Sequence, residues 1–227
     1  MHLLGVPGCV TGSLSTTCCL SSAKIGPVEV KKRLWPRMIK LKAIEATEIS
    51  FQEFGQVMEP SPDGQEFGPH DAQLELHRGI PRFYIMHVED RPFRFSQITH
   101  HASVTQCLGS IGGQEWYLGV AKASLVDRSE VNDDSGSAHC QIDNLGMKLR
   151  KAKSGHYYLP PLLEDVRIFL VDGPKCLKLN RGTWHAGPLF RSKTMDFYNM
   201  ELSNTNVVDR TTHDFEQEDG VIFLIDD

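Results

Sequence analysis

The sequence has no surplus of basic residues, no long apolar run and no Cys-x-x-Cys pair. Its 24 Lys and Arg residues stand against 29 Asp and Glu residues, a formal net charge of −5. Nucleic-acid-binding proteins normally carry a basic patch, so this charge argues against nucleic acid as a partner, and it gives no support to binding at an acidic membrane. No window reaches the roughly 18 apolar residues that a membrane-spanning helix requires. The six cysteines form no Cys-x-x-Cys pair, which argues against a zinc finger or thioredoxin motif and favours reduced thiols over a disulfide framework.

Acidic residues are nearly absent from residues 1–37, where Glu29 is the only one. The segment is rich in Ser and Thr, and its basic residues come late: Lys24, Lys31, Lys32, Arg33 and Arg37. This composition is typical of an organelle transit peptide. A disordered tail before a true start at Met38, or a secretory signal, are the other interpretations. We expect a cytoplasmic protein, with import into a plastid or another organelle through a transit peptide as the alternative.

Residues 38–227 are expected to form one domain, because 40% hydrophobic residues are enough to close a sizeable core. Short segments that alternate apolar and polar residues, separated by turn residues, predict strands. One short helix fits between Glu45 and Val57. The main predicted strands are 39–44, 73–77, 82–88, 94–98, 116–121, 165–171, 176–179, 195–202 and 220–225. This pattern predicts an all-β fold with minor α content, arranged as a sandwich or barrel.

Residues 127–155 lack the alternation of the predicted strands. The stretch contains the polar run Asn-Asp-Asp-Ser-Gly-Ser at 132–137 and several basic residues near its end. We interpret it as a long polar excursion from the domain, either a lid or a disordered loop.

Two histidine clusters fall on predicted strands. In the first, Thr99 and His101 share one face because alternate residues of a strand do so, and His100 faces the other way. Gln106 lies five residues after His101, beyond a turn or bulge, and could rejoin that face. In the second cluster, a tight Asn-Arg-Gly turn delivers His185 to the start of the next strand. Together the clusters suggest a pocket inside a β-barrel.

These clusters resemble the two cupin motifs, Gly-x5-His-x-His-x3-4-Glu-x6-Gly and Gly-x5-Pro-x-Gly-x2-His-x3-Asn. His101 matches the second histidine of the first motif, and His185 matches the histidine of the second. Thr99 stands in place of the first histidine and Gln106 in place of the glutamate. Gly182 falls three residues before His185, as the second motif requires.

The replacements are similar to those of the ureidoglycolate lyase family of cupins. That family keeps a glutamine in its first motif, a Gly-x-Trp-His sequence followed by Pro-Leu in its second, and then an Asp-Phe strand. The corresponding residues here are Phe51, Phe54, Gly55 and Val57 at the opening, Gly182 to His185, Pro188-Leu189 and Asp196-Phe197. Two positions depart from the family: its first-motif glutamate is Thr99, and the arginine after its Asp-Phe-x3-Asp is Leu202.

The resemblance implies a cupin-type double-stranded β-helix or jelly-roll barrel that forms a homodimer. It also implies a lyase that splits ureidoglycolate into glyoxylate and urea in purine catabolism. The alternative is a cupin that binds a small carboxylate ligand or a protein partner without turnover.

The expected roles follow from this comparison and from the chemistry of the side chains. Two histidines could act directly as acid and base, since their ordinary pKa is near neutral. A divalent ion such as Ni, Mn or Zn would be held weakly, because imidazole suits these metals whereas an amide oxygen is a poor ligand. The candidate catalytic residues and metal ligands are His101, Gln106 and His185. The candidate substrate-binding residues, for a small ureido acid or carboxylate, are Thr99, Lys178, Arg181 and Asp196.

Overall fold

The computed structural model describes residues 35–127 and 148–227. Strands dominate these residues, which confirms the prediction of a mostly β fold with little helix. No helix among them is long and apolar enough to cross a membrane. Most of the predicted tail at 1–37 lies outside the described residues, and the first strand begins at Arg37.

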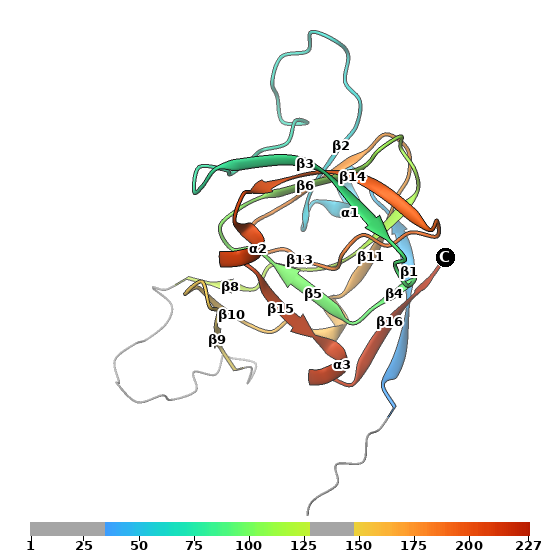
Figure 1. The fold of residues 1–227 in the computed structure, drawn as a ribbon, viewed down its shortest axis with the longest axis vertical. Coiled ribbons are helices and arrows are strands. Elements are labelled where there is room, and N and C mark those ends of the chain that lie inside the picture. Colours follow the sequence, from blue (N-terminus) through green and yellow to red (C-terminus); the bar gives the residue numbers. More distant parts are fainter. Residues whose placement is uncertain (1–34, 128–147) are drawn as a thin grey trace, which may run out of the picture. The chain divides into compact units, whose positions relative to one another are not determined.

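The larger of two main sheets has eight strands (Figure 1). Its order is β15 (Thr211–Asp214), β5 (Gln97–His100), β13 (Trp184–His185), β7 (Trp116–Ala121), β11 (Arg167–Val171), β1 (Arg37–Glu45), β16 (Val221–Asp226) and β4 (Arg94–Phe95). β1 pairs in parallel with β11 and with β16, while the other neighbours are antiparallel.

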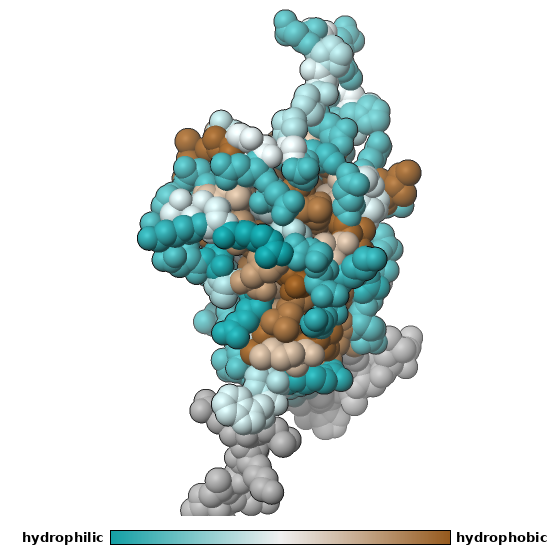
Figure 2. Space-filling model, turned by 90° about the vertical axis from the view of Figure 1, so that its right-hand side faces the viewer, coloured by the Kyte–Doolittle hydropathy of each residue, from teal (hydrophilic) through white to brown (hydrophobic). Residues whose placement is uncertain are grey.

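The second sheet has five antiparallel strands. Its order is β2 (Gly55–Met58), β12 (Cys176–Leu179), β6 (Gln106–Ser110), β14 (Thr194–Leu202) and β3 (Pro81–Glu89). The segment between β2 and β3 projects from the top of the ribbon in Figure 1, and Figure 2 shows that projection as largely hydrophilic. Residues 73–77, predicted as a strand, pair with no strand of either sheet. Glu75 instead exchanges hydrogen bonds with Thr105 in a loop.

The helices within residues 35–127 and 148–227 are single turns at strand ends. They are α1 (Glu48–Phe51), the 3-10 turn η2 (Leu163–Asp165), α2 (Thr205–Val208) and α3 (Phe215–Glu218). α1 lies where the sequence predicts a short helix, and it begins with a capping box in which Thr47 and Ser50 satisfy each other's backbone N–H groups.

A small third sheet pairs β10 (Tyr157–Tyr158) with β8 (Leu125–Val126) and with β9 (Arg150–Lys151). It contains the end of the predicted polar excursion at 127–155. Residues 128–147 of that excursion lie outside the described residues, whereas Arg150–Lys151 forms a strand rather than a loop.

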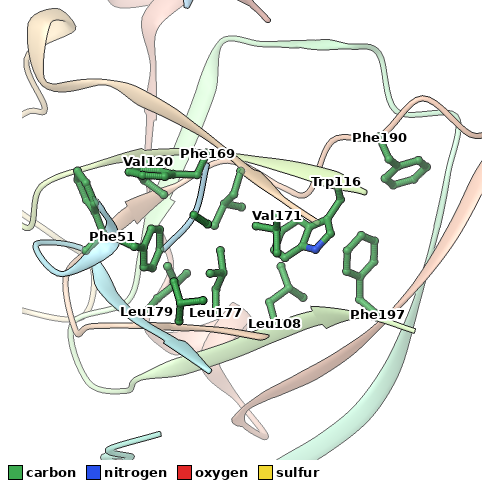
Figure 3. Close-up of a cluster of buried hydrophobic side chains, with 14 of the residues drawn as sticks. Phe51, Leu108, Trp116, Val120, Phe169, Val171, Leu177, Leu179, Phe190 and Phe197 are labelled. Atoms are coloured by element: carbon green, nitrogen blue, oxygen red, sulfur yellow. The ribbon is translucent and has the colours of Figure 1, made fainter. Parts of the chain in front are cut away.

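Two apolar cores lie on the two faces of the eight-stranded sheet. Strand alternation separates them: Trp116, Leu118 and Val120 of β7 point into one core, and Tyr117 and Ala121 into the other. Figure 3 shows the first core, where Phe51 packs near Phe169 at one end and Phe197 packs near Trp116 and Phe190 at the other. The second core collects residues of β4, β5, β16, α3 and β10, so the large sheet curls around it. The two facing sheets leave room for a pocket at the end of the first core.

Candidate functional site

A cavity of about 170 Å³ opens between the two main sheets. Thr99, His101 and His185 line it from the eight-stranded side. The opposite wall comes from the five-stranded sheet, through Tyr84, Met86, Gln106, Leu108, Asn199 and Glu201, and Arg91, Asn206 and Arg210 also line it. The structure therefore brings together four residues singled out from the sequence: Thr99, His101, Gln106 and His185.

Strand pairing positions the two histidines. β13 lies beside β5, and His185 stands directly opposite Thr99 in the antiparallel register. Gly182 makes the preceding turn with a φ of 78°, a conformation that glycine adopts without strain, and its N–H donates to the carbonyl of His101 at 2.7 Å. The turn that the sequence indicates thus fixes His185 and also ties it to the histidine of the neighbouring strand.

Each histidine uses its Nδ1 on the backbone. Nδ1 of His101 lies 2.9 Å from the carbonyl oxygen of Asp209, and Nδ1 of His185 lies 3.2 Å from that of Thr183. A carbonyl only accepts, so Nδ1 carries the proton in both rings and the neutral form keeps its lone pair on Nε2. Burial lowers the pKa of both side chains, and their ring centroids are 5.3 Å apart. The pocket wall therefore holds two neutral imidazoles.

Asp209 fixes the segment that carries His101. Its carboxylate accepts the backbone N–H groups of Ala102 and Ser103, at 3.1 and 2.7 Å, while its own carbonyl receives the imidazole proton. Asp209 is itself buried. It is a positioning residue for the histidine, and no motif in the sequence marks it.

Gln106 shares the pocket with His101, but it reaches it from β6 of the opposite sheet rather than by rejoining the face of Thr99 and His101. Its amide N–H group donates to Oδ1 of Asn199 at 3.1 Å and to Oε2 of Glu201 at 3.3 Å. These two hydrogen bonds orient the amide. Its Oε1 is buried and finds no partner among the described residues. This oxygen is an unused acceptor in the pocket wall.

Glu201 is the main site residue that the sequence reasoning missed. Its carboxylate is only 1% exposed and accepts hydrogen bonds from Tyr84 and Asn206, at 3.3 and 3.1 Å, besides that of Gln106. The guanidinium of Arg82 lies 3.8 Å away. Burial raises the pKa of this carboxyl above its usual range. A signal was available, because Met195, Phe197, Asn199 and Glu201 alternate along β14, which places a carboxylate on its inward face.

Three of the expected substrate-binding residues lie outside the pocket, which corrects the expectation that they line it. Lys178 lies on the outward face of β12, where its Nζ bonds to Asn180 at 2.6 Å. Arg181 holds a loop by bonding to the carbonyl of Ala102 and to Glu75. Asp196 is exposed and pairs with His87 at 2.6 Å. Lys178 and Asp196 each neighbour a core residue on their strand and so face away from the pocket, whereas Arg181 lies in the turn between β12 and β13.

The donor set of the pocket fits a weakly held divalent ion. Nε2 of His101, Nε2 of His185 and Oε1 of Gln106 are all acceptors without a protein partner in the part of the chain that the structure describes. Within those same residues, no cluster of three or more His, Cys, Asp or Glu side chains could hold a metal. Two imidazoles and one amide oxygen form a poorer set than three imidazoles and a carboxylate.

No family model matches this chain, and no curated protein matches it significantly. The fold and the site still define a class. The chain is a mostly β protein with a curled eight-stranded sheet, and its small pocket joins neutral imidazoles to a buried carboxyl group.

Proposed function

We propose that this protein is a cupin-type barrel and that its pocket splits a small ureido acid of the ureidoglycolate type into glyoxylate and urea. The observation that carries the proposal is the arrangement of two neutral imidazoles opposite a buried carboxyl group in one cavity of about 170 Å³. That volume suits a ligand of a few heavy atoms. The motif resemblance at His101 and His185 supports the same class.

The chemistry requires one proton to move between two atoms of the substrate. Ureidoglycolate carries a hydroxyl and a ureido nitrogen on the same carbon. When the hydroxyl proton is removed, the oxygen forms the carbonyl of glyoxylate, the C–N bond breaks, and the nitrogen takes a proton to leave as urea. A group whose pKa lies near neutrality is best suited to accept and return that proton.

Glu201 suits this transfer better than the histidines do. Burial raises its pKa above that of an ordinary carboxyl group, whereas burial moves the pKa of His185 and His101 downward and weakens both as bases. This changes the expectation that the histidines act as acid and base. Their Nε2 lone pairs instead accept hydrogen bonds from the N–H or O–H groups of the substrate, and Gln106 Oε1 offers a third acceptor.

A divalent metal, if bound, would be held by His101, Gln106 and His185. It would polarise a substrate oxygen and lower the pKa of the substrate hydroxyl. With a metal bound, proton transfer would still fall to the opposite wall of the pocket, chiefly to Glu201.

One observation favours a second candidate function, the binding of a small carboxylate without turnover. Thr99 stands where the lyase family has glutamate, and its hydroxyl is paired with that of Thr212 at 3.0 Å. The wall around the histidines therefore contributes no carboxylate of its own.

The test is to incubate the purified protein with ureidoglycolate and to measure urea and glyoxylate, after chelation and again with added Ni, Mn or Zn. We expect both products in equal amounts above the uncatalysed rate. The Glu201→Gln variant keeps the size of the side chain and should lose this release. If the wild-type protein releases no urea beyond the background under any metal condition, the lyase proposal is wrong and the binding function replaces it.

A further inference from the structure

Arg91 occupies the turn that connects the two main sheets at the pocket. The turn joins β3 of the five-stranded sheet to β4 of the eight-stranded sheet. Asp90, just before it, has a φ of 47°, and its N–H donates to the carbonyl of Lys193 at 2.9 Å. Asx residues tolerate this left-handed conformation better than most others. The backbone that carries Arg91 is thus fixed in direction.

The guanidinium of Arg91 lies directly against the backbone of Gly187. A Cβ added at Gly187 would stand 3.1 Å from Nη1 and 3.3 Å from Cζ and Nη2 of that guanidinium. Gly187 follows His185 by two residues, so the segment that carries the histidine also contacts the guanidinium of Arg91. The φ of Gly187 is not in the left-handed region, so the requirement for glycine here is one of space.

Arg91 borders two cavities. One is the pocket of His101 and His185, and the other is a cavity of about 360 Å³ that Arg94 also lines. Among the described residues, no carboxylate pairs with either arginine. An unpaired guanidinium has five N–H donors in a planar fork, which matches the two oxygens of a carboxylate.

We propose that Arg91, seated on Gly187, is the residue that recognises the carboxylate of the pocket's ligand. This assigns to Arg91 the role that the sequence suggested for Lys178 and Arg181, neither of which lines the pocket. The inference rests on the proposed function for the identity of the ligand, but it concerns binding and not turnover.

The test measures binding by calorimetry, with oxalate and glycolate as charged probes and glycolamide as the neutral counterpart of glycolate. Arg91→Met should weaken binding of both anions by about tenfold or more and leave glycolamide unaffected. Arg91→Lys, which keeps the charge without the fork, should give an intermediate loss. Gly187→Ala keeps Arg91 but places a methyl group against its guanidinium, so we expect the affinity for both anions to fall several-fold.

Arg94→Met is the matched control, because Arg94 lines only the neighbouring cavity; it should bind the probes as the wild type does. Thermal unfolding of each variant checks that the fold is intact, and Arg91 is exposed enough for this to be expected. The inference is overturned if Arg91→Met binds the anions normally, or if the wild type binds neither anion at millimolar concentration. It is also overturned if Arg210→Met abolishes binding while Arg91→Met does not. Carboxylate binding that depends on Arg91 without any urea release would uphold this inference while the lyase proposal fails.

Discussion

Aromatic and imidazole side chains lie on both faces of the neighbouring segments β5 and β13, but only one face borders the pocket. We call the pocket face, with His101 and His185, the inner face, and the opposite face, with His100 and Trp184, the outer face. On one face His101 and His185 line the pocket, and on the other His100 and Trp184 are completely buried, with ring centroids 4.0 Å apart. Each buried residue immediately precedes a pocket residue in the chain. A shift of one position along either strand would exchange the two faces.

Burial and hydrogen bonding together distinguish the face that can serve a ligand, because His100 and Trp184 are completely buried. The pocket histidines give Nδ1 to backbone carbonyls and keep Nε2 free. His100 instead places its Nε2 2.8 Å from Nε2 of His156, while Trp184 donates to the hydroxyl of Ser124 at 2.8 Å. The outer pair is therefore covered by residues next to the small sheet of β8, β10 and β9. The comparison assigns ligand binding to the inner face and stability to the outer one, and it can be tested residue by residue.

The largest expected effect is on stability, from Trp184→Ala. Removing a fully buried indole leaves a cavity and should lower the free energy of unfolding by about 3–5 kcal/mol. Trp184→Phe retains a ring against His100 and should cost less, because it loses chiefly the hydrogen bond to Ser124. Urea-induced unfolding followed by fluorescence and circular dichroism measures both. Equal stability of the two variants would show that the outer face does not contribute through packing.

The next effect concerns activity, from His185→Ala. Within the proposed function, the rate of urea release from the substrate should fall by about 10²-fold or more. The midpoint of denaturation, measured with urea as the denaturant, should change far less than for Trp184→Ala. His87→Ala is the control, since His87 forms an exposed pair with Asp196 on the outward side of the five-stranded sheet. That control should keep full activity. A His185→Ala variant with wild-type turnover would contradict the assignment of the inner face to the ligand.

Much of this comparison is accessible from the sequence, because it depends on local periodicity. The alternation of Thr99, His100 and His101 places the first and third residues on one face, and the Asn-Arg-Gly turn brings His185 to the neighbouring strand. The same rule, applied strictly, also places Lys178 and Asp196 outward, since the neighbouring Leu177, Leu179 and Phe197 are core residues. Both residues lie close to the motifs along the chain, but closeness along the chain does not turn a side chain into the pocket.

The other parts of the site depend on contacts between distant segments. Gln106 lies in the five-stranded sheet, and its partner Asn199 is 93 residues away. Arg91 enters through a turn whose direction is set by the backbone of Asp90, and Asp209 reaches the loop after β5 across 107 residues. Local propensity says nothing about which loops meet at a pocket. The cupin comparison predicts the histidine wall, whereas the acidic and cationic groups require the three-dimensional arrangement.

A smaller effect is expected from acidification, and buried histidines on both faces contribute to it, because burial lowers the pKa of His101 and His185 as well as that of His100. Burial, followed by the nearby His156, lowers the pKa of His100 from 6.5 to about 3, and burial also lowers the pKa of His156, against the opposing effect of Asp209. An unfolded histidine takes up a proton below about pH 6.5, whereas folded His100 stays neutral to about pH 3. The unfolded state thus binds more protons, and stability present above pH 6.5 is lost as the pH falls toward 3.

For His100 alone, this loss should be about 2 kcal/mol between about pH 7 and pH 5. Urea unfolding at a series of pH values measures it. The His100→Phe variant keeps a ring beside Trp184 but cannot titrate, and it also frees His156, so its stability should depend less on pH. An unchanged slope in this variant would show that other groups control the acid response.

The smallest effect is expected at the edge of the outer cover, where Arg150 of β9 pairs with Glu218 of α3 at 2.6 Å. Both side chains are about one-third exposed, at 38% and 33%, so water and salt screen the pair. Arg150→Met should therefore lower the free energy of unfolding by less than about 1 kcal/mol, and by less still at high salt. Unfolding curves at low and high ionic strength measure the difference. A loss as large as that of Trp184→Ala would mean that the ion pair, and not the packing of His100 and Trp184, holds the small sheet over the outer face.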